Sequence, residues 1–197
     1  MPPPLLVSFV ATTSAGDAGC WRIERIAPVI GDPLPAASHL AVDEDRTPPT
    51  AAVWSLRGTT SNTRYTTRTE TTALTARQEG LGRPDATLAA LIPIRKTEAW
   101  WALAQDERRR IFEESSRHIA IGLDYLPGVA RRLHHCRELG EPFDFLTWFE
   151  YGPQHADAFE DLVDRLRATE EWRYVDREVD IRLSRDRSTT ASRDAAA

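Results

Sequence analysis

The sequence is poor in cysteine, in lysine and in long apolar runs. It contains two cysteines, Cys20 and Cys136, which are far apart and outside any CxxC spacing. We therefore expect neither a zinc site of the CxxC type nor a disulfide framework, and interpret both as free thiols. The apolar run at residues 5–11 is too short to span a membrane and lacks the basic residues that open a secretory signal. The sequence thus predicts a cytoplasmic protein without a membrane segment.

Basic residues are also fewer than acidic ones. The chain of 197 residues carries 25 basic and 30 acidic residues, a net charge of −5. Because nucleic-acid binding needs a concentrated basic face, we expect no nucleic-acid partner. Hydrophobic residues make up 41% and charged residues 28%, a balance typical of a globular protein with a sizeable core. Of the basic residues, Lys96 is the single lysine.

The first 88 residues are β-like but weakly patterned. Strands are predicted at residues 5–11, 20–27 and 51–57. Residues 32–50 are rich in Pro, Ala and Asp, which predicts a surface loop, and residues 59–75 hold so many threonines that periodicity decides nothing. We expect residues 1–88 to form a β-rich N-terminal half, for which a degenerate ferredoxin-like subdomain is one interpretation.

The pattern is clearer from residue 89 onward. The predicted elements are a strand at 89–96, a helix from Asp106 to near Pro127, strands at 129–138 and 143–151 joined as a hairpin, a helix from Pro153 with a regular apolar stripe, and a strand at 172–183. This β-α-β-β-α-β order predicts an α+β fold for residues 89–184: a ferredoxin-like antiparallel sheet with helices on one face, of the dimeric α+β barrel type. The polar residues 185–197 are predicted to be a disordered tail.

His118 is the histidine best placed for chemistry, because it lies on the inward face of the predicted helix. The pattern alone favours a core histidine bonded to a backbone carbonyl, with a metal or haem ligand as the alternative. The acid pairs Glu113–Glu114 and Glu170–Glu171 are of a kind that is usually solvated. The sequence contains no GxSxG motif and no phosphate-binding glycine loop, so neither site is indicated.

A series of short motifs resembles the haem domain of the chlorite dismutase family. In chain order these are LIPIRK (91–96), WW (100–101), DERR (106–109), His118, YLP (125–127), AR (130–131), LHH (133–135), GEPFDFLTWFE (140–150) and EEW (170–172). The similarity covers about residues 91–183, with weaker matches upstream. The length and the absence of a leader resemble the short, typically dimeric branch of the family.

The resemblance implies a site that holds one haem b per subunit of a homodimer. His118 would be the proximal iron ligand, and Glu171 would accept a hydrogen bond from its other ring nitrogen. Lys96 would join that network. Trp100 would lie beside the haem, and Trp101 near the subunit contact.

On the opposite side of the haem, the resemblance implies that Arg131 is the distal, catalytic residue. Thr147 and Phe149, which share one face of a predicted strand, would line the same cavity. A permanently charged guanidinium suits a small anionic substrate such as chlorite. The implied function is haem-dependent decomposition of chlorite to chloride and dioxygen, with the O–O bond forming at the iron.

Two alternatives stay open. Coprohaem decarboxylases and peroxidase-like haem enzymes belong to the same superfamily, but the decarboxylases carry Gln or His at the position of Arg131, which therefore favours chlorite. A non-catalytic haem-binding sensor would share His118 and the sheet yet would need no distal cation.

Overall fold

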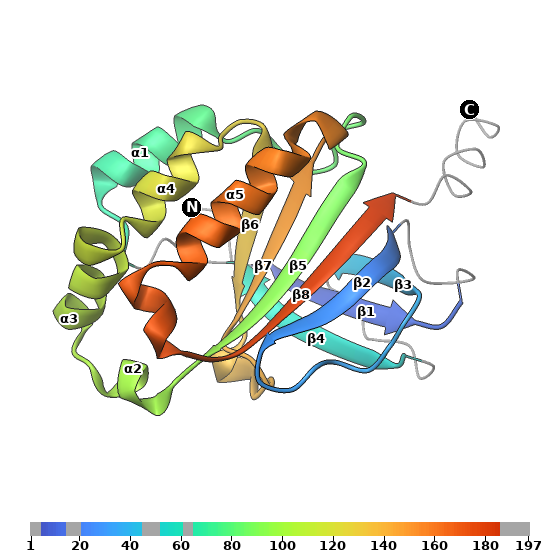
Figure 1. Ribbon diagram of the computed structural model, residues 1–197, viewed down its shortest axis with the longest axis horizontal. Coiled ribbons are helices and arrows are strands. Elements are labelled where there is room, and N and C mark those ends of the chain that lie inside the picture. The colour runs from blue at the N-terminus through green and yellow to red at the C-terminus, as the bar shows by residue number, and fades with distance from the viewer. Residues whose placement is uncertain (1–4, 15–20, 45–51, 61–64, 186–197) are drawn as a thin grey trace.

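A closed antiparallel barrel with helices packed on one side forms the framework of the protein (Figure 1). The computed structural model describes residues 5–14, 21–44, 52–60 and 65–185. Among these, eight strands follow one another around the barrel in the order β1-β3-β2-β8-β5-β7-β6-β4, and β4 pairs with β1 to close it. Their bounds are β1 Leu6–Thr12, β2 Trp21–Ile30, β3 His39–Glu44, β4 Trp54–Thr60, β5 Leu88–Lys96, β6 Val129–His135, β7 Phe145–Tyr151 and β8 Val175–Arg185.

The N-terminal strands agree with the predicted ones at three places and differ at a fourth. Strands β1, β2 and β4 lie where the composition predicted them, although Cys20 and Ala51 are outside the described residues. The loop predicted over residues 32–50 is wrong for His39–Glu44, which forms β3 and pairs with β1 from Val7↔Glu44 to Thr12↔His39. The unpaired edge of β1 accepts this segment, so tertiary pairing overrides its local composition.

The predicted fold class, a ferredoxin-like α+β sheet with helices on one face, is wrong. Strands β8, β5, β7 and β6 do lie side by side, but both outer strands of this set are paired. Strand β8 pairs with β2, as at Ala27↔Asp180, and β6 pairs with β4, as at Thr59↔His135. Unpaired strand edges expose hydrogen-bonding groups, and the N-terminal strands satisfy them here. The result is a closed barrel with a minor helical share, built from strands of residues 1–88 and 89–184 alike. The tail at 186–197 lies outside the described residues.

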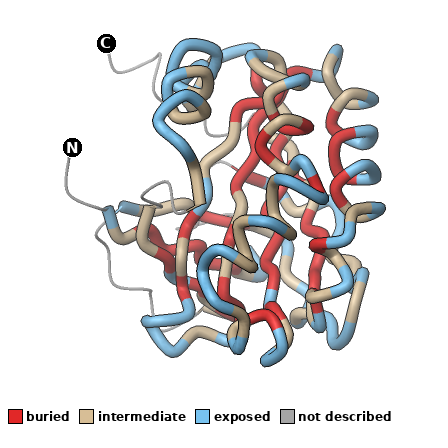
Figure 2. Tube along the Cα trace, turned by 90° about the vertical axis from the view of Figure 1, so that its left-hand side faces the viewer, coloured by how far each residue is buried: buried red, intermediate tan, exposed pale blue. Residues whose placement is uncertain are grey.

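Side chains alternate between two apolar cores, one inside the barrel and one between the barrel and the helices. Figure 2 shows the buried residues of the strands and helices in red. In β7, Leu146 and Trp148 point into the barrel, whereas Phe149 and Tyr151 point out towards the helices. Trp148 meets the rings of Phe9 and Trp21 at centroid distances of 5.8 and 5.4 Å. The two-residue period of the strands therefore produces a filled barrel and a second layer outside it.

The helices gather on the outer face of β5, β6 and β7. They are α1 Arg68–Arg77, α2 Glu98–Ala102, α3 Gln105–Arg109, α4 His118–Asp124 and α5 Ala156–Arg167, with a π-helical turn at Arg110–Ser115 and 3-10 turns at Arg137–Leu139, Pro153–His155 and Glu170–Tyr174. No helix among the described residues is long and apolar enough to cross a membrane.

Helix α1 was not predicted, because threonine dominates its sequence. Thr67 and Glu70 form a capping box at its start, and none of its residues is buried. An ion pair of 2.7 Å between Glu70 Oε1 and Arg109 Nη2 attaches it to α3. The hydrogen bond from Arg109 lowers the pKa of Glu70 to about 2. Polar contacts rather than an apolar face thus hold this helix.

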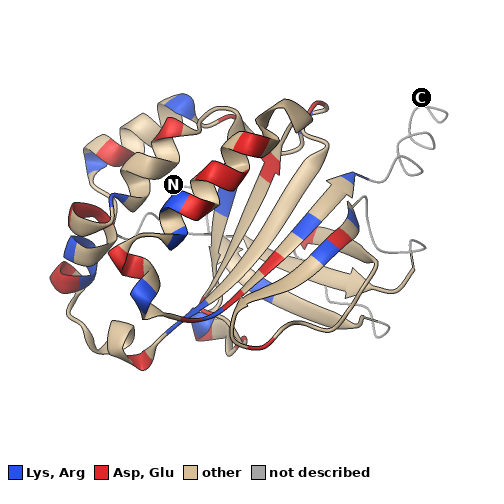
Figure 3. Ribbon diagram, in the orientation of Figure 1, with Lys and Arg blue, Asp and Glu red and all other residues tan. Residues whose placement is uncertain are grey.

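Helix α5 packs its apolar stripe on the barrel as predicted. Phe159, Leu162, Val163 and Leu166 are buried, and charged residues, most of them acidic, lie on the outer face (Figure 3). Beneath α5, the side chain of Glu178 on β8 points outward from the barrel and is fully buried. Its Oε1 lies 2.7 Å from Arg167 Nη2 at the end of α5. Charged residues of β8 are therefore also found in the layer between the barrel and the helix.

We expect Trp148→Ala to lower the free energy of unfolding by about 3–5 kcal/mol, because it empties the middle of the barrel. Urea unfolding of the purified chain measures this change. The matched control is Val29→Ala on β2, which is 41% exposed. That substitution should stay within about 0.5 kcal/mol of the parent. Equal losses for the two variants would contradict a well-packed barrel interior.

Candidate functional site

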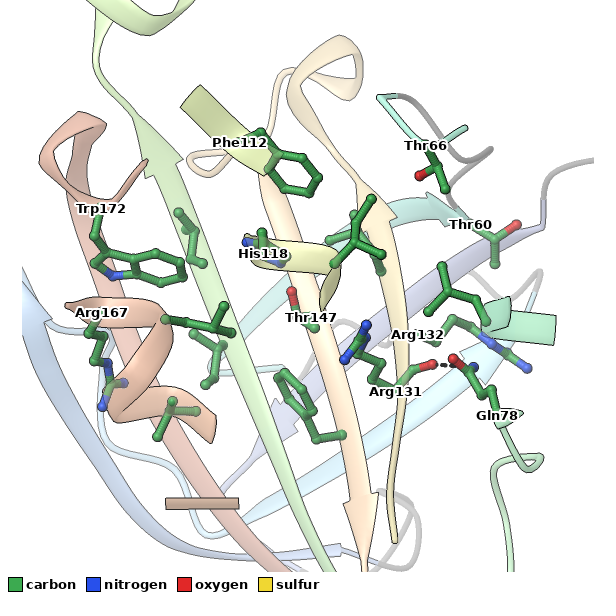
Figure 4. A pocket seen from close by; sticks show the side chains of 18 of the residues that line it. Thr60, Thr66, Gln78, Phe112, His118, Arg131, Arg132, Thr147, Arg167 and Trp172 are labelled. Carbon is green, nitrogen blue, oxygen red and sulfur yellow. Dashed lines mark hydrogen bonds between the residues drawn. The ribbon is translucent and has the colours of Figure 1, made fainter. Parts of the chain in front are cut away.

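A cavity of about 610 Å³ lies between the outer face of the barrel and the helices. Apolar side chains from β5, β7 and α5 form much of its wall: Ile92, Ile94, Phe149, Val163 and Leu166. His118 and Arg131 both point into it (Figure 4). A largely apolar cavity of this size with a few polar groups is typical of a cofactor or small-ligand site.

A break in the helix places His118 at the first position of α4. The prediction of one helix from Asp106 to Pro127 is wrong, because the chain changes to a π-helical turn at Arg110–Ser115 and Arg117 adopts a left-handed φ of 53°. The Glu113 carboxylate then accepts the backbone N–H groups of Ile119 at 2.6 Å and Ala120 at 3.2 Å. Glu113, expected to be solvated, thus replaces a conventional N-cap for α4.

Glu171 joins His118 to Lys96. Its Oε2 lies 2.7 Å from His118 Nδ1, and its Oε1 lies 2.7 Å from Lys96 Nζ. Lys96 and Glu171 are each 4% exposed. An ionised carboxylate can only accept, so Nδ1 of His118 carries the proton and Nε2 keeps its lone pair. Among the described residues Nε2 has no hydrogen-bond partner.

A neighbouring charge and two hydrogen bonds keep Glu171 ionised. Burial by itself raises the pKa of this carboxyl, but the charge of Lys96 and the hydrogen bonds from His118 and Lys96 outweigh burial and hold the pKa well below its ordinary value. The Lys96 ammonium lies 4.7 Å from the ring centroid of Trp100 and 5.4 Å from that of Trp172. These aromatic faces add to the stabilisation of the buried cation.

Three residues without a predicted role hold the imidazole of His118 and its partner Glu171. The ring of Phe112 stacks on His118 at 4.5 Å, and Trp172 lies parallel to it at 6.4 Å. Ser116 Oγ accepts the backbone N–H of Glu171 at 2.9 Å. The position of Trp172 directly after Glu171 was the available signal for its role. Phe112 and Ser116 become neighbours of His118 and Glu171 only through the broken helix.

Arg131 enters the cavity from β6. Burial lowers the pKa of its guanidinium to about 10, so it stays a cation at neutral pH. No carboxylate of the described chain forms an ion pair with it. Phe149 is its partner in the strand ladder, and Gln78 Nε2 donates to its backbone oxygen at 2.6 Å (Figure 4). Arg131 is thus a half-buried cation that faces a cavity and has no counter-ion among the described residues.

The structure brings most of the predicted residues to this one place. His118, Arg131, Thr147 and Phe149 line the cavity. Glu171, Lys96 and Trp100 lie behind His118, and Trp100, 1% exposed, is not part of the cavity wall.

Two other predicted residues lie outside the cavity. Trp101 stacks on Phe145 at 6.0 Å and carries the guanidinium of Arg137 at 4.1 Å from its ring centroid. Cys136 is a buried free thiol that donates to the carbonyl oxygen of Phe143, and burial raises the pKa of this thiol. Neither side chain takes part in the polar network of the cavity.

The model of the chlorite dismutase family matches residues 43–187, well over half of this sequence. The chain belongs to the chlorite dismutase family. A dimeric chlorite dismutase from Nitrobacter winogradskyi is 60% identical in sequence, and the superposition covers 91% of this chain and 99% of that one with a TM-score of 0.83. The resemblance read from the sequence is therefore confirmed.

Two other relatives are less similar to this chain. A chlorite dismutase from Ideonella dechloratans is 33% identical over 86 residues, which are 44% of this chain and 28% of that protein's length. The chlorite dismutase of Candidatus Nitrospira defluvii in complex with imidazole is 22% identical over 91% of each chain, with a TM-score of 0.65. This last similarity supports the fold alone.

We expect Lys96→Met to lower the free energy of unfolding by about 3–5 kcal/mol, because it leaves Glu171 as a buried charge without its strongest partner. Urea unfolding of the cofactor-free chain measures the loss, and Lys96→Met combined with Glu171→Gln should recover part of it. The matched control is Arg95→Met. Arg95 also lies on β5, but its 2.8 Å pair with Asp176 is exposed on both sides. Its loss should cost at most about 1 kcal/mol. A Lys96→Met variant as stable as Arg95→Met would contradict the buried network.

Proposed function

We propose that this chlorite dismutase family member binds haem b in the cavity, one per subunit, and converts chlorite to chloride and dioxygen. One observation carries the proposal: an imidazole with an unpartnered Nε2 and a half-buried guanidinium without a counter-ion among the described residues face the same cavity, whose exposed wall is mainly apolar. The first is suited to ligating a metal, the second to receiving an anion. This is also the reaction for which the family is named.

The donor set fits a haem whose iron is bound by His118. Nε2 is the available ligand atom, and Glu171 fixes the proton on Nδ1 and raises the basicity of the ring. Lys96 keeps that carboxylate ionised. The apolar wall of Ile92, Ile94 and neighbouring side chains suits a flat, largely apolar macrocycle. When bound, haem supplies the iron at which oxygen transfer and O–O bond formation take place.

Arg131 is proposed to attract and hold the anion. Its guanidinium remains charged at neutral pH and has no proton to lose in the reaction. Because much of the wall is apolar, the attraction between guanidinium and chlorite would be stronger there than in water. Thr147 and Phe149 lie on β7, next to the strand of Arg131, and would limit the escape of hypochlorite from the site. Such confinement favours formation of the O–O bond over release of hypochlorite.

The alternatives are supported less well by this site. Arg131 has no ion-pair partner among the described residues, and placing such a cation partly out of water costs stability. A haem sensor would gain nothing from that cost. A coprohaem decarboxylase remains the second candidate, because it too would use His118 and a large cavity. We also propose a homodimer, as described for the Nitrobacter winogradskyi relative, with Trp101 near the contact between subunits.

The decisive measurement is an oxygen-electrode trace after chlorite is added to haem-loaded protein, and we expect about one dioxygen per chlorite from the balance of the reaction. Arg131→Ala should retain haem but lose roughly tenfold to hundredfold in turnover, since a lost hydrogen bond to a charged group costs about 1.5–3 kcal/mol. It should also release hypochlorite, which a chemical trap detects.

Arg165→Ala is the matched control, because Arg165 is 42% exposed on the outer side of α5. It should evolve oxygen at the parent rate. An Arg131→Ala variant with the parent's rate and durability would refute the distal role. Absence of oxygen from fully loaded parent protein would instead favour the decarboxylase, tested with coprohaem and peroxide.

We expect His118→Ala to abolish stable haem binding, because it removes the only imidazole in the wall of the cavity among the described residues. Titration of the cofactor-free chain with haem, followed at the Soret band, measures this. His155→Ala, which removes an imidazole at the start of α5, should load haem normally. Retention of the full parent Soret spectrum by His118→Ala would disprove the ligand assignment.

A further inference from the structure

A second buried carboxylate borders the cavity. Glu178 on β8 is fully buried, and its side chain lines the same cavity as His118. Its Oε1 accepts from Arg167 Nε at 2.9 Å and from Nη2 at 2.7 Å, and its Oε2 accepts from Trp172 Nε1 at 2.7 Å. Each oxygen of Glu178 therefore has a donor of its own, as each oxygen of Glu171 has.

Trp172 connects Glu178 to the groups around Glu171. The indole of Trp172 lies at 20° to the imidazole plane of His118, with ring centroids 6.4 Å apart. The same indole has its ring centroid 5.4 Å from Lys96 Nζ. His118 and Lys96 are the two side chains that bond the Glu171 carboxylate. One ring thus lies next to both of these donors, so its orientation affects each of them.

The hydrogen bond to Glu178 restrains an indole that packing encloses only in part. Trp172 is half-buried and borders the cavity. A hydrogen bond from an N–H group to a carboxylate is roughly twice as strong as one between neutral groups. The negative charge of the acceptor also polarises the indole, which strengthens the attraction of the ring for the Lys96 ammonium. Glu178 therefore fixes both the orientation of the indole and its contact with Lys96.

Stability alone does not account for a carboxylate at this position. Replacing a buried ion pair by apolar side chains of similar size is often neutral or even stabilising. The second apolar core, between the barrel and α5, could accommodate such a replacement. A glutamate that bonded only Arg167 would therefore add little to the fold. The bond to Trp172 gives the carboxylate a role that an apolar side chain could not fill.

We propose that Glu178 is a positioning residue for the imidazole of His118, and that it acts through Trp172. The hydrogen bond between Nδ1 and Glu171 fixes one edge of the imidazole but still permits its plane to tilt. The indole, held in one orientation by Glu178, limits that tilt. The effect on an iron ligand rests on the proposed function, whereas the contact between Glu178 and Trp172 does not.

The contact is tested by NMR on the full-length, cofactor-free chain labelled with 15N at tryptophan. Each of the six tryptophans gives one indole N–H signal, and the signal of Trp172 is the one that Trp172→Phe removes. A charged acceptor moves the proton of an N–H group further downfield than a neutral one does. We therefore expect Glu178→Gln to move the Trp172 signal upfield. A signal that is unmoved in Glu178→Gln would overturn the proposal.

The matched control is Asp180→Asn. Asp180 also lies on β8, is 2% exposed and bonds Arg167 at 3.0 Å, but the indole N–H of Trp172 goes to Glu178. The control thus removes a buried charge and a partner of Arg167 while it keeps the bond under test. The Trp172 signal should stay in place in this variant.

A double-mutant cycle on haem-loaded protein tests the effect on His118. In the ferric cyanide complex, the pattern of the shifted haem-methyl 1H signals depends on the plane of the axial imidazole. We expect Trp172→Phe and Glu178→Gln each to change this pattern and to weaken haem binding roughly tenfold, the lower end of the range for groups that support a metal ligand. In a Trp172→Phe background, Glu178→Gln should add almost nothing, because the connecting N–H group is gone. Equal effects in both backgrounds would show that Glu178 acts by its charge alone and would contradict the inference.

Trp172→Phe keeps the test decisive if Glu178→Gln does not fold. This variant retains the aromatic ring and the ion pair between Glu178 and Arg167, and loses only the N–H donor. An unchanged haem-methyl pattern in Trp172→Phe would by itself overturn the positioning role. The melting temperature of each variant shows whether it is folded.

The two proposals can fail separately. If the parent releases no oxygen while Glu178→Gln, but not Asp180→Asn, changes the haem-methyl pattern, the chlorite reaction is wrong and the positioning role stands. If the parent releases oxygen and Glu178→Gln changes neither the indole signal nor the haem-methyl pattern, the chlorite reaction stands and the positioning role is wrong. A parent that binds no haem would overturn both.

Discussion

The carboxylate of Glu171 is the group on which the geometry of the site depends. It is almost fully buried, and each of its oxygens lies 2.7 Å from a different donor, Lys96 Nζ and His118 Nδ1. A buried carboxylate without partners would be prohibitively unfavourable, so the ionised form requires both donors at once. The donors belong to β5 and α4, and Glu171 itself belongs to the turn before β8. One charge therefore holds together three segments that are distant in the sequence.

The same carboxylate determines the chemistry that His118 can offer. Because Glu171 accepts at Nδ1, the proton is fixed there and Nε2 is left as a lone pair at the cavity. Phe112 and Trp172 flank the imidazole and restrict its rotation. The orientation of the ring is thus set within the protein, which reduces the entropy lost when a ligand binds.

Two of the three arginines in the wall of the cavity differ in how their charge is balanced. Arg167 is bonded to Glu178 and Asp180 at 2.7 and 3.0 Å, so its charge is already neutralised. Arg131 has no such partner, and only burial acts on its pKa. An unpaired cation that is partly removed from water lowers stability, which proteins tolerate where a ligand supplies the missing charge.

Local sequence by itself determined the elements whose periodicity is strong. The alternation in β7 and the apolar stripe of α5 were predicted because each depends only on residues a few positions apart. The motifs around His118, Glu171 and Lys96 placed the chain in its family, and the resemblance also singled out Arg131 from its many chemically identical neighbours.

Tertiary structure alone decided how the barrel closes and where the helix breaks. Strand β3 exists because β1 offers it an edge, and β2 and β4 pair with strands more than 70 residues away in sequence. Such pairing leaves no mark in local composition. The break in the helix before His118 likewise leaves no mark in the periodicity of the sequence. Short-range pattern determines which faces are apolar, but only long-range contact determines what each face meets.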